Sequence, residues 1–253
     1  MEVAPVHTMM FNAIGFLYWS AGKYREARSY LEKSVATGRK FGNSLNLAWA
    51  LNYLGATALA QGDQQTAHAS LEEAFQMATG MGSLGKHAIG WAMAFLGDIP
   101  FLNQNYKEAQ SFYEMSILAL GEVGNKNMKA YPLRRLGYLS LQRQEHENAR
   151  ELFKESLLLN HELRHQVGTL GSVVAFGALA NAGKNFPRSA RLLGAVEANL
   201  ETLAVHLLPS DRREYSCNVA ILPDQLDQQA LTDTWAEGRS MSLEQAVDFA
   251  LER

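Results

Sequence analysis

A small residue that returns about every forty positions constrains the fold of this 253-residue chain more than any other feature. Gly55 follows Leu51 by one helical turn, and its bare Cα lets a second helix come close. Ala67 lies twelve residues later, beyond a turn at residues 61–63. The template also fits at Gly15, Gly97 and Gly137, so the glycines stand 40, 42 and 40 residues apart. The pattern therefore predicts antiparallel helix pairs repeated along the chain.

Helix pairs of this size cannot bury their apolar faces alone, so they stack into a solenoid with an extended groove. The pattern of small and large side chains in the second pair resembles a tetratricopeptide repeat, at Trp49, Leu51, Leu54, Gly55, Ala58, Ala67, Leu71 and Ala74. HEAT-type repeats also have a period near forty, but the Gly and Ala placement favours the tetratricopeptide alternative. We expect an all-α, right-handed superhelical solenoid of about five helix pairs with a helical C-terminal cap.

The expected repeat array covers residues 1–206, with repeats near 8–40, 46–80, 88–122, 128–165 and 168–206, and the cap covers residues 207–253. Three prolines mark helix boundaries in this scheme. Pro100 predicts a bend or an early end to its helix, Pro132 is expected in a first turn, and Pro187 should begin the last second helix. Ser242 and Gln245 form a capping-box pattern before the final helix.

Composition excludes several classes of partner. A formal net charge of −3 without a cluster of Lys and Arg argues against direct contact with nucleic acid or an anionic membrane. Cys217 is the only cysteine, so an internal disulfide is impossible, and no apolar run is long enough to span a membrane. We expect a cytoplasmic protein. The first helix pair has no polar helix before it, so either it exposes apolar surface, which could form a homodimer, or the chain belongs to a longer protein, which we favour.

One catalytic motif occurs and is interpreted as a chance match. Residues 161–165 read H-E-L-R-H, the pattern that places two imidazoles of a zinc protease on one helix face. The segment falls where the second helix of the fourth repeat should end, and no third ligand is evident. Cys217 is expected to be half-buried, with no His and acid beside it to activate it. We therefore expect no catalytic residue, no metal, no cofactor and no enzyme activity.

The first helix of each pair is expected to line the concave wall of the solenoid. Aromatic and Arg side chains supply much of the binding energy at interfaces, and Asn amides can clamp a peptide backbone. Arg134 with Arg135 could receive a carboxylate. In the alternative interpretation, the large aromatic residues only fill junctions between helices. The groove candidates are Asn12, Phe16, Trp19, Trp49, Asn52, Trp91, Phe95, Tyr131, Arg134 and Tyr138.

Over essentially its whole length, the chain resembles the C-terminal region of large bacterial signal-transduction ATPases, including LuxR-type and AfsR-type transcriptional regulators. The residues that carry this resemblance are A-R-L-L-G-A-V-E at 190–197 and W-A-E-G-R-S-M-S-L-E-Q-A-V at 235–247. The resemblance implies a sensor segment that receives a peptide, a protein segment or a small inducer and that restrains a parent ATPase domain. The phosphate-binding loop of such an ATPase is not in this sequence. We expect a non-enzymatic binding module; the alternative is a scaffold that self-associates or docks on its own ATPase domain.

Overall fold

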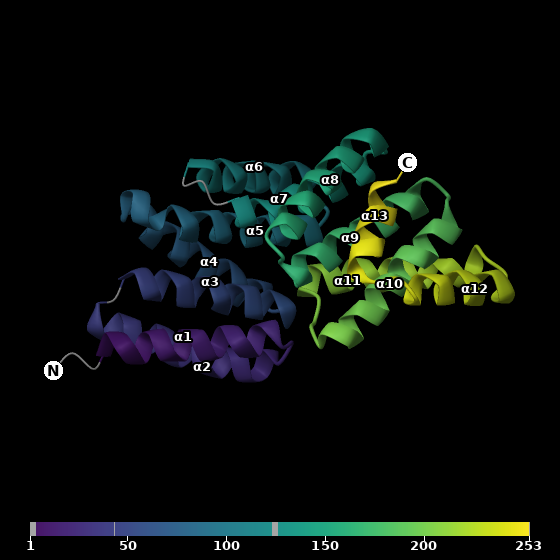
Figure 1. Ribbon diagram of the computed structural model, residues 1–253. Helices are drawn as coiled ribbons and strands as arrows, with labels where there is room; N and C mark the ends of the chain where they lie inside the picture. Colours follow the sequence, from purple (N-terminus) through teal and green to yellow (C-terminus); the bar gives the residue numbers. More distant parts are fainter. Residues whose placement is uncertain (1–3, 43, 123–125, 253) are drawn as a thin grey trace. The chain divides into compact units, whose positions relative to one another are not determined.

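The computed structural model describes residues 4–42, 44–122 and 126–252. The chain divides into two compact units, which we call unit 1 (Met1–Pro132) and unit 2 (Leu133–Arg253). Every regular element in the described part of the chain is helical, and no strand occurs there. The prediction of an all-α fold built from about five helix pairs and a helical C-terminal region is confirmed (Figure 1).

Helix pairs follow one another in chain order through both units. We call the first helix of each pair its A helix and the second its B helix. Unit 1 contains α1 (Ala4–Ser20), α2 (Tyr24–Phe41), α3 (Ser44–Ala60), α4 (Gln64–Thr79), η1 (Gly82–Gly85), α5 (Lys86–Leu102), α6 (Tyr106–Glu122) and the start of α7 (Lys126–Gln142). Unit 2 contains the rest of α7 with α8 (His146–Glu162), α9 (Gln166–Ala182), α10 (Phe186–Leu203), α11 (Pro209–Ile221), η2 (Leu222–Asp224), α12 (Gln228–Arg239) and α13 (Leu243–Leu251).

Each repeat glycine lies where its A helix touches its B helix. A Cβ added to Gly55 would lie 2.5 Å from Cγ of Leu71, sixteen residues later. The same spacing joins four further pairs: Gly15 to Leu31, Gly97 to Tyr113, Gly137 to Phe153 and Gly177 to Leu193. The B-helix side chains Leu31, Leu71, Tyr113, Phe153 and Leu193 are fully buried. The forty-residue pattern therefore records a repeated contact between a bare Cα and a large side chain.

The prolines bear out one boundary prediction and correct two others. Asn185 caps α10 by accepting a hydrogen bond from Arg188 N at 3.2 Å, and Pro187 lies in the first turn, as predicted. Helix α5 continues through Pro100 to Leu102, so of the two expected outcomes the early end is wrong and the bend stays a prediction. Helix α7 begins at Lys126, which places Pro132 in its interior and not in the first turn. Its first turn is polar and gives little periodic signal, and the burial of later residues offsets a proline cost of about 3 kcal/mol.

The C-terminal helices belong to the same compact unit as repeats four and five. Ser242 and Gln245 form the predicted capping box, and α13 buries Ala246, Val247 and Ala250 against α9 and α10. Helix α12 packs along α10. The division at residue 206 between the repeat array and the cap stays a prediction. Across the described residues, no helix has the length and apolar character needed to cross a membrane.

Candidate functional site: the faces of the A helices

Seven aromatic side chains follow one another along the A helices of unit 1, and we call them the aromatic wall. Adjacent rings are in contact range along the row: the ring centroids are 5.0 Å apart between Phe16 and Tyr53, 6.2 Å between Trp19 and Phe95, and 5.6 Å between Phe95 and Tyr131. Such pairs contribute about 0.5–1.5 kcal/mol each beyond their burial. The wall consists of Phe16, Trp19, Trp49, Tyr53, Trp91, Phe95 and Tyr131.

The wall has a buried layer and a layer that reaches the surface. Trp19, Phe95 and Tyr131 are buried, as expected for side chains that fill the junctions between A helices. Phe16 is 38% exposed, and Trp49, Tyr53 and Trp91 are half-buried. Of the ten candidates predicted from the sequence, Phe16, Trp49 and Trp91 are therefore the ones most open to a ligand.

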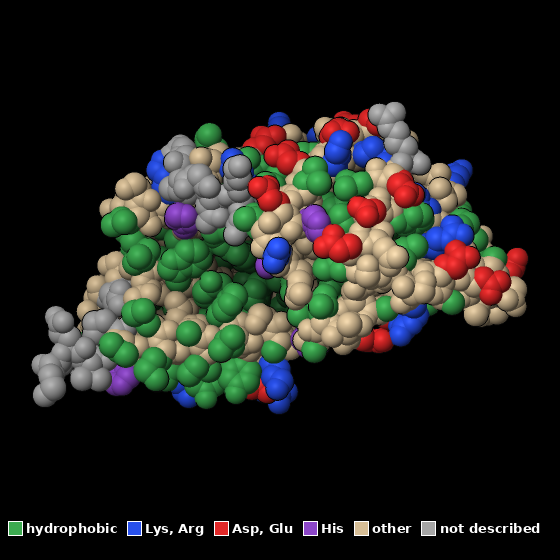
Figure 2. All heavy atoms as spheres, viewed as in Figure 1, with side chains coloured by type: hydrophobic (Ala, Val, Ile, Leu, Met, Phe, Trp, Pro, Cys, Tyr) green, Lys and Arg blue, Asp and Glu red, His purple; other side chains and the backbone are tan. Residues whose placement is uncertain are grey.

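A groove of about 310 Å³ runs between α1 and α3, and we call it the α1–α3 groove. Figure 2 shows apolar side chains gathered over α1 and α3 on the face turned to the viewer. None of the side chains that line this groove is charged, and burial raises the pKa of Tyr53 to about 12. The groove is therefore neutral and mainly apolar. Its lining residues are Met9, Asn12, Ala13, Phe16, Asn46, Trp49 and Tyr53.

Asn12 and Asn52 link successive A helices. Each stands three residues before its repeat glycine. Asn12 Nδ2 donates to the carbonyl of Asn46 at 3.3 Å, and Asn52 Nδ2 donates to the carbonyl of Ala88 at 2.9 Å. The buried Oδ1 of each amide has no hydrogen-bond partner in the described structure. Asn52 is 1% exposed and lies inside the repeat interface, whereas Asn12 also borders the α1–α3 groove.

Tyr131 closes the wall through a buried carboxylate. Asp98 accepts hydrogen bonds from the hydroxyl groups of Tyr113, at 2.7 Å, and Tyr131. All three side chains are buried, so this cluster fixes α5 to α6 and to the start of α7. The position of Tyr131 is structural, and its predicted contact with a ligand stays a prediction.

In unit 2, the A-helix face that corresponds to the aromatic wall is covered by α11. Arg134 is 1% exposed and forms a two-pronged ion pair with Asp211 of α11, with Nε to Oδ1 at 2.9 Å and Nη2 to Oδ2 at 2.7 Å. Its Nη1 donates to Ser156 and Ser172 at 3.3 and 3.4 Å. The carboxylate that we expected from an external ligand is thus supplied by the chain itself. Tyr138, the last groove candidate, is 3% exposed and away from solvent.

Two further contacts extend this arrangement along α11. Arg135 lies 3.6 Å from Glu214, and Asn181 Nδ2 donates to the carbonyl and side-chain oxygens of Asn218 at 3.1 and 3.0 Å. The sequence indicates a polar helix around Cys217, but the contacts of this helix with α7 and α9 were not predicted, because they leave no apolar periodicity. The available signal was a polar stripe of Asp211, Glu214 and Asn218, whose spacings of three and four residues place them on one helix face.

Tyr53 is not among the groove residues predicted from the sequence, although its spacing from Gly55 marks it. Tyr53 stands two residues before Gly55, as Phe95 stands two residues before Gly97. Phe95 is one of the predicted groove residues, and Tyr53 is its equivalent in the preceding repeat. A comparison of all offsets from the repeat glycines would have found it.

The H-E-x-x-H segment does not place its two imidazoles on one helix. Helix α8 ends at Glu162, Arg164 has a left-handed φ of 52°, and His165 precedes α9. His161 Nε2 lies 3.2 Å from Glu244, while His165 Nδ1 lies 3.1 Å from Asn160 Oδ1. Burial, aided by the nearby Arg134 charge, lowers the pKa of His165. The helix end therefore breaks the geometry that a zinc protease requires.

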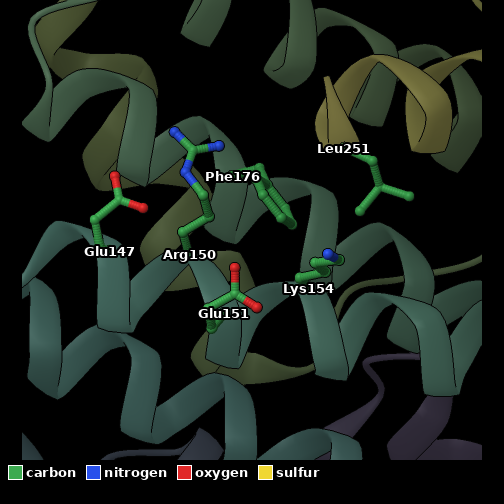
Figure 3. Close-up of a pocket in the computed structure, with 6 residues that line it drawn as sticks. All are labelled: Glu147, Arg150, Glu151, Lys154, Phe176 and Leu251. Carbon is green, nitrogen blue, oxygen red and sulfur yellow. The ribbon is translucent and has the colours of Figure 1, made fainter. Parts of the chain in front are cut away.

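Two other features of unit 2 offer no defined chemistry. Cys217 is exposed, so the expectation that it is half-buried is wrong. A pocket of about 280 Å³ lies beside α8 (Figure 3). Its charged side chains alternate in sign along α8, so they cancel and select neither anions nor cations. The residues shown are Glu147, Arg150, Glu151, Lys154, Phe176 and Leu251.

Comparisons with known proteins agree with this architecture. Residues 6–80 match the tetratricopeptide repeat family. The search of curated proteins gave no match. The structure is similar to the crystal structure of BtubC (BKLC) from P. vanneervenii, with 16% identity, a TM-score of 0.58, and coverage of 90% of this chain and 89% of that chain.

A second similar structure is a crystal structure of a point-substituted form of the Podosopora anserina putative kinesin light chain nearly identical TPR-like repeats. It has 17% identity and a TM-score of 0.53, and the alignment covers 81% of this chain and 100% of that chain. At such identities the likeness concerns the fold alone. The helix pairs, the repeated glycine contacts and the match over residues 6–80 together show that this chain has the tetratricopeptide-repeat fold.

Proposed function

We propose that unit 1 binds a peptide or protein segment in the α1–α3 groove, through an apolar or aromatic side chain of that segment. Tetratricopeptide repeats generally serve as protein-interaction modules with extended binding surfaces. The observation that carries the proposal is the neutral groove of about 310 Å³ bordered by exposed Phe16 and half-buried Trp49 and Tyr53. Rigid aromatic rings of this kind anchor interfaces at small entropic cost.

Asn12 is one of the polar residues that line the groove. Asn12 Oδ1 is a buried acceptor without a hydrogen bond, and Asn12 lines the groove. A backbone N–H of the ligand would reach this oxygen only if the Asn12 amide turned toward the groove, which would break its bond to the carbonyl of Asn46. A small apolar inducer is the second kind of ligand that would fit a groove of this size.

The wider role that we propose is regulatory and non-enzymatic. The motifs at residues 190–197 and 235–247 support placement within a larger bacterial signal-transduction ATPase or transcriptional regulator in the cytoplasm. In that setting, ligand binding to unit 1 would change how the chain restrains the parent ATPase domain. The formal charge of −3 supports a protein or peptide as the partner, in preference to nucleic acid.

A phage-display library of random peptides, selected on the purified chain, tests the groove. We expect the enriched sequences to be neutral and to share an aromatic or large apolar residue. Their affinity should fall about tenfold or more in Phe16→Ala and Tyr53→Ala, the loss typical of an interface anchor. Leu118→Ala is the matched control, because Leu118 is 66% exposed on the B helix α6. Peptides that bind both groove variants as well as wild type would disprove the proposal.

A scaffold function is the second candidate, and one observation favours it. Val6, Met10 and Leu17 of α1 are 53%, 53% and 64% exposed and recur at helical spacing on one face. A self-associating chain would cover such a face with a second copy. Docking on the parent ATPase domain would use the same surface.

A further inference from the structure

Helix α11 is held in unit 2 by polar contacts, with little apolar burial. The buried side chains among its 13 residues are Asp211 and Asn218. By contrast, α13 buries Ala246, Val247 and Ala250. Interfaces that separate and rejoin are typically more polar than permanent ones. The composition of α11 is therefore that of an element that docks reversibly.

The contacts of α11 form one line against α7 and α9. Asp211 binds Arg134, Glu214 lies beside Arg135, and Asn218 accepts from Asn181. Arg134 and Arg135 are 1% and 2% exposed, so α11 and its neighbours bury two cations whose charges need anions. This face therefore favours a helix that presents a carboxylate to Arg134.

Gly171 shows that the face is shaped for a carboxylate. It stands six residues before Gly177, the repeat glycine of repeat five. In repeats two to four, the residue six positions before the repeat glycine is aromatic: Trp49, Trp91 and Tyr131. A Cβ on Gly171 would lie 2.5 Å from Asp211 Oδ2 and 3.2 Å from Arg134 Nη2. The absence of the aromatic side chain in repeat five thus makes room for the Asp211 carboxylate.

Short segments connect α11 to α10 and α12, and each contains one buried leucine, Leu207 before the helix and Leu222 after it. Helix α10 ends at Ala204 in the left-handed conformation, with a φ of 50°, and residues 205–208 are not helical. On the other side, η2 and residues 225–227 precede the Asp227 cap of α12. Helices α10 and α12 pack directly on each other, so their contact does not depend on α11.

We propose that α11 is a releasable latch and that the face beneath it binds an acidic helical segment of a partner protein. That segment would present a carboxylate, a second carboxylate three residues later and an amide four residues after that, and would displace α11 by making the same contacts. The latch involves unit 2 alone and does not require the groove of unit 1. A failure of either proposal therefore leaves the other in place.

A peptide with the sequence of residues 207–222 is the probe. In wild type, the tethered α11 competes at an effective concentration on the order of 1 mM, so the fluorescein-labelled peptide should bind weakly. Asp211→Asn weakens the tethered copy and leaves the receptor side chains in place. We expect this full-length variant to bind the peptide about tenfold or more tightly than wild type does, by fluorescence anisotropy. A peptide in which Asp211 and Glu214 are replaced by Asn and Gln should not bind.

A second measurement keeps the test decisive if Asp211→Asn is poorly folded. Cys217 is the only cysteine and is exposed on α11, so a spin label there reports the mobility of this helix. Gly171→Ala should increase the label's mobility, and it should not bind the peptide because its Cβ fills the carboxylate site. Gly183→Ala is the control at the end of the same helix, since its nearest Cβ neighbours are at 3.5 and 3.6 Å.

Two results would overturn the latch. One is unchanged label mobility in Gly171→Ala together with no peptide binding to Asp211→Asn, which would make α11 a fixed part of unit 2. The other is loss of the whole helical signal of unit 2 whenever α11 is disturbed, which would show that the helix cannot leave a folded unit. Equal binding of the acidic and neutral peptides would contradict the proposed chemistry of the partner.

Discussion

The repeat glycines act through the side chains they touch. At Gly55 the helix backbone meets Leu71, and at Gly97 it meets Tyr113, always sixteen residues later. Closely packed interiors have no space for an added methyl group at such contacts. The identity of these residues is therefore set by the distance between two helix axes and not by backbone conformation.

Gly55→Ala should destabilise unit 1. The new Cβ would lie 2.5 Å from Leu71 Cγ and 3.2 Å from the backbone oxygen of Ala67. Overpacking of this kind costs about 1–3 kcal/mol, measurable by urea unfolding with tryptophan fluorescence. Gly183→Ala is the control and should be neutral or stabilising by up to about 1 kcal/mol. Equal losses in both variants would show that the contact with Leu71 is unimportant.

Glu214→Gln should reveal a pH-dependent cost in unit 2. Burial raises the pKa of Glu214 above its usual value, an effect that Arg135 and Arg213 oppose and Asp211 reinforces. A carboxyl whose folded pKa is raised favours folding when it is protonated, and that contribution is lost as pH rises through the folded pKa. Glu214→Gln removes this pH-dependent contribution, so the stability of the variant relative to wild type should rise as the pH is raised from about 4.5 to about 7.

Urea midpoints of the two proteins at both pH values provide the measurement. A difference that does not change with pH would mean that the Glu214 charge costs nothing in the folded state. A difference that grows on acidification would mean that its pKa is lowered and not raised.

At the residue scale, the sequence predicted on which helix face a side chain lies better than it predicted whether that side chain is exposed to solvent. Phe16 and Trp49 were selected from helical spacing and do reach the surface. Asn52 and Arg134 were selected by the same reasoning and are buried, one against the next A helix and the other beneath α11. Periodicity identifies the face on which a side chain lies, but it does not tell what covers that face.

At the scale of elements, the motifs that carry the resemblance join α10 to α12. Trp235 Nε1 donates to Glu197 at 2.9 Å, and Arg239 pairs with Glu201 at 2.8 Å. A Cβ on Gly194 would lie 2.7 Å from the carbonyl oxygen of Trp235. The residues of the two motifs therefore serve the packing of α10 against α12, and the motifs indicate a structural arrangement.

Gly238→Ala should separate α12 from α10. Its Cβ would collide with the backbone carbonyl of Arg191, which cannot turn aside as a side chain can. We expect unit 2 to lose at least about 1–3 kcal/mol, measured by urea unfolding followed by circular dichroism. Glu237→Gln, the neighbouring control, removes only a partly exposed ion pair with Arg191 and should cost less than about 1 kcal/mol. A Gly238→Ala protein as stable as the control would contradict this packing.

Helix boundaries were predictable wherever a cap or a periodic stripe marked them. Ser242 and Pro187 were read correctly because capping chemistry is local. The start of α7 and the path of α5 through Pro100 were not, since packing of later residues overrides the local preference of a proline. The face by which α11 packs is polar, so no apolar periodicity in the sequence indicated where this helix would pack.

At the scale of the whole molecule, the outer face of α1 differs from those of the later A helices. Met10 stands five residues before its repeat glycine and is 53% exposed, whereas Ala50 and Ala92 at that offset are fully buried. Leu17 is 64% exposed, and Thr57 at its offset is fully buried. Small residues thus serve the internal repeat interfaces, and large apolar residues occupy the open face.

Self-association through α1 is the resulting prediction. Sedimentation velocity over a dilution series should show wild type shifting toward a larger species as concentration rises. Leu17→Glu and Met10→Asp should shift the distribution toward monomer, because each places a charge in the apolar contact. Leu118→Asp, a control on α6, should not. A wild-type chain that is monomeric at every concentration would rule out this interface.

The Arg134 and Arg135 pair has a practical consequence for anyone who shortens this chain. A fragment ending near residue 206 would retain both guanidinium groups and lose Asp211 and Glu214, which neutralise them. Such a fragment would offer a cationic surface and would attract polyanions such as RNA from a crude extract. Molecules recovered with the fragment would bind because the acidic residues are missing, and they would not identify a biological ligand.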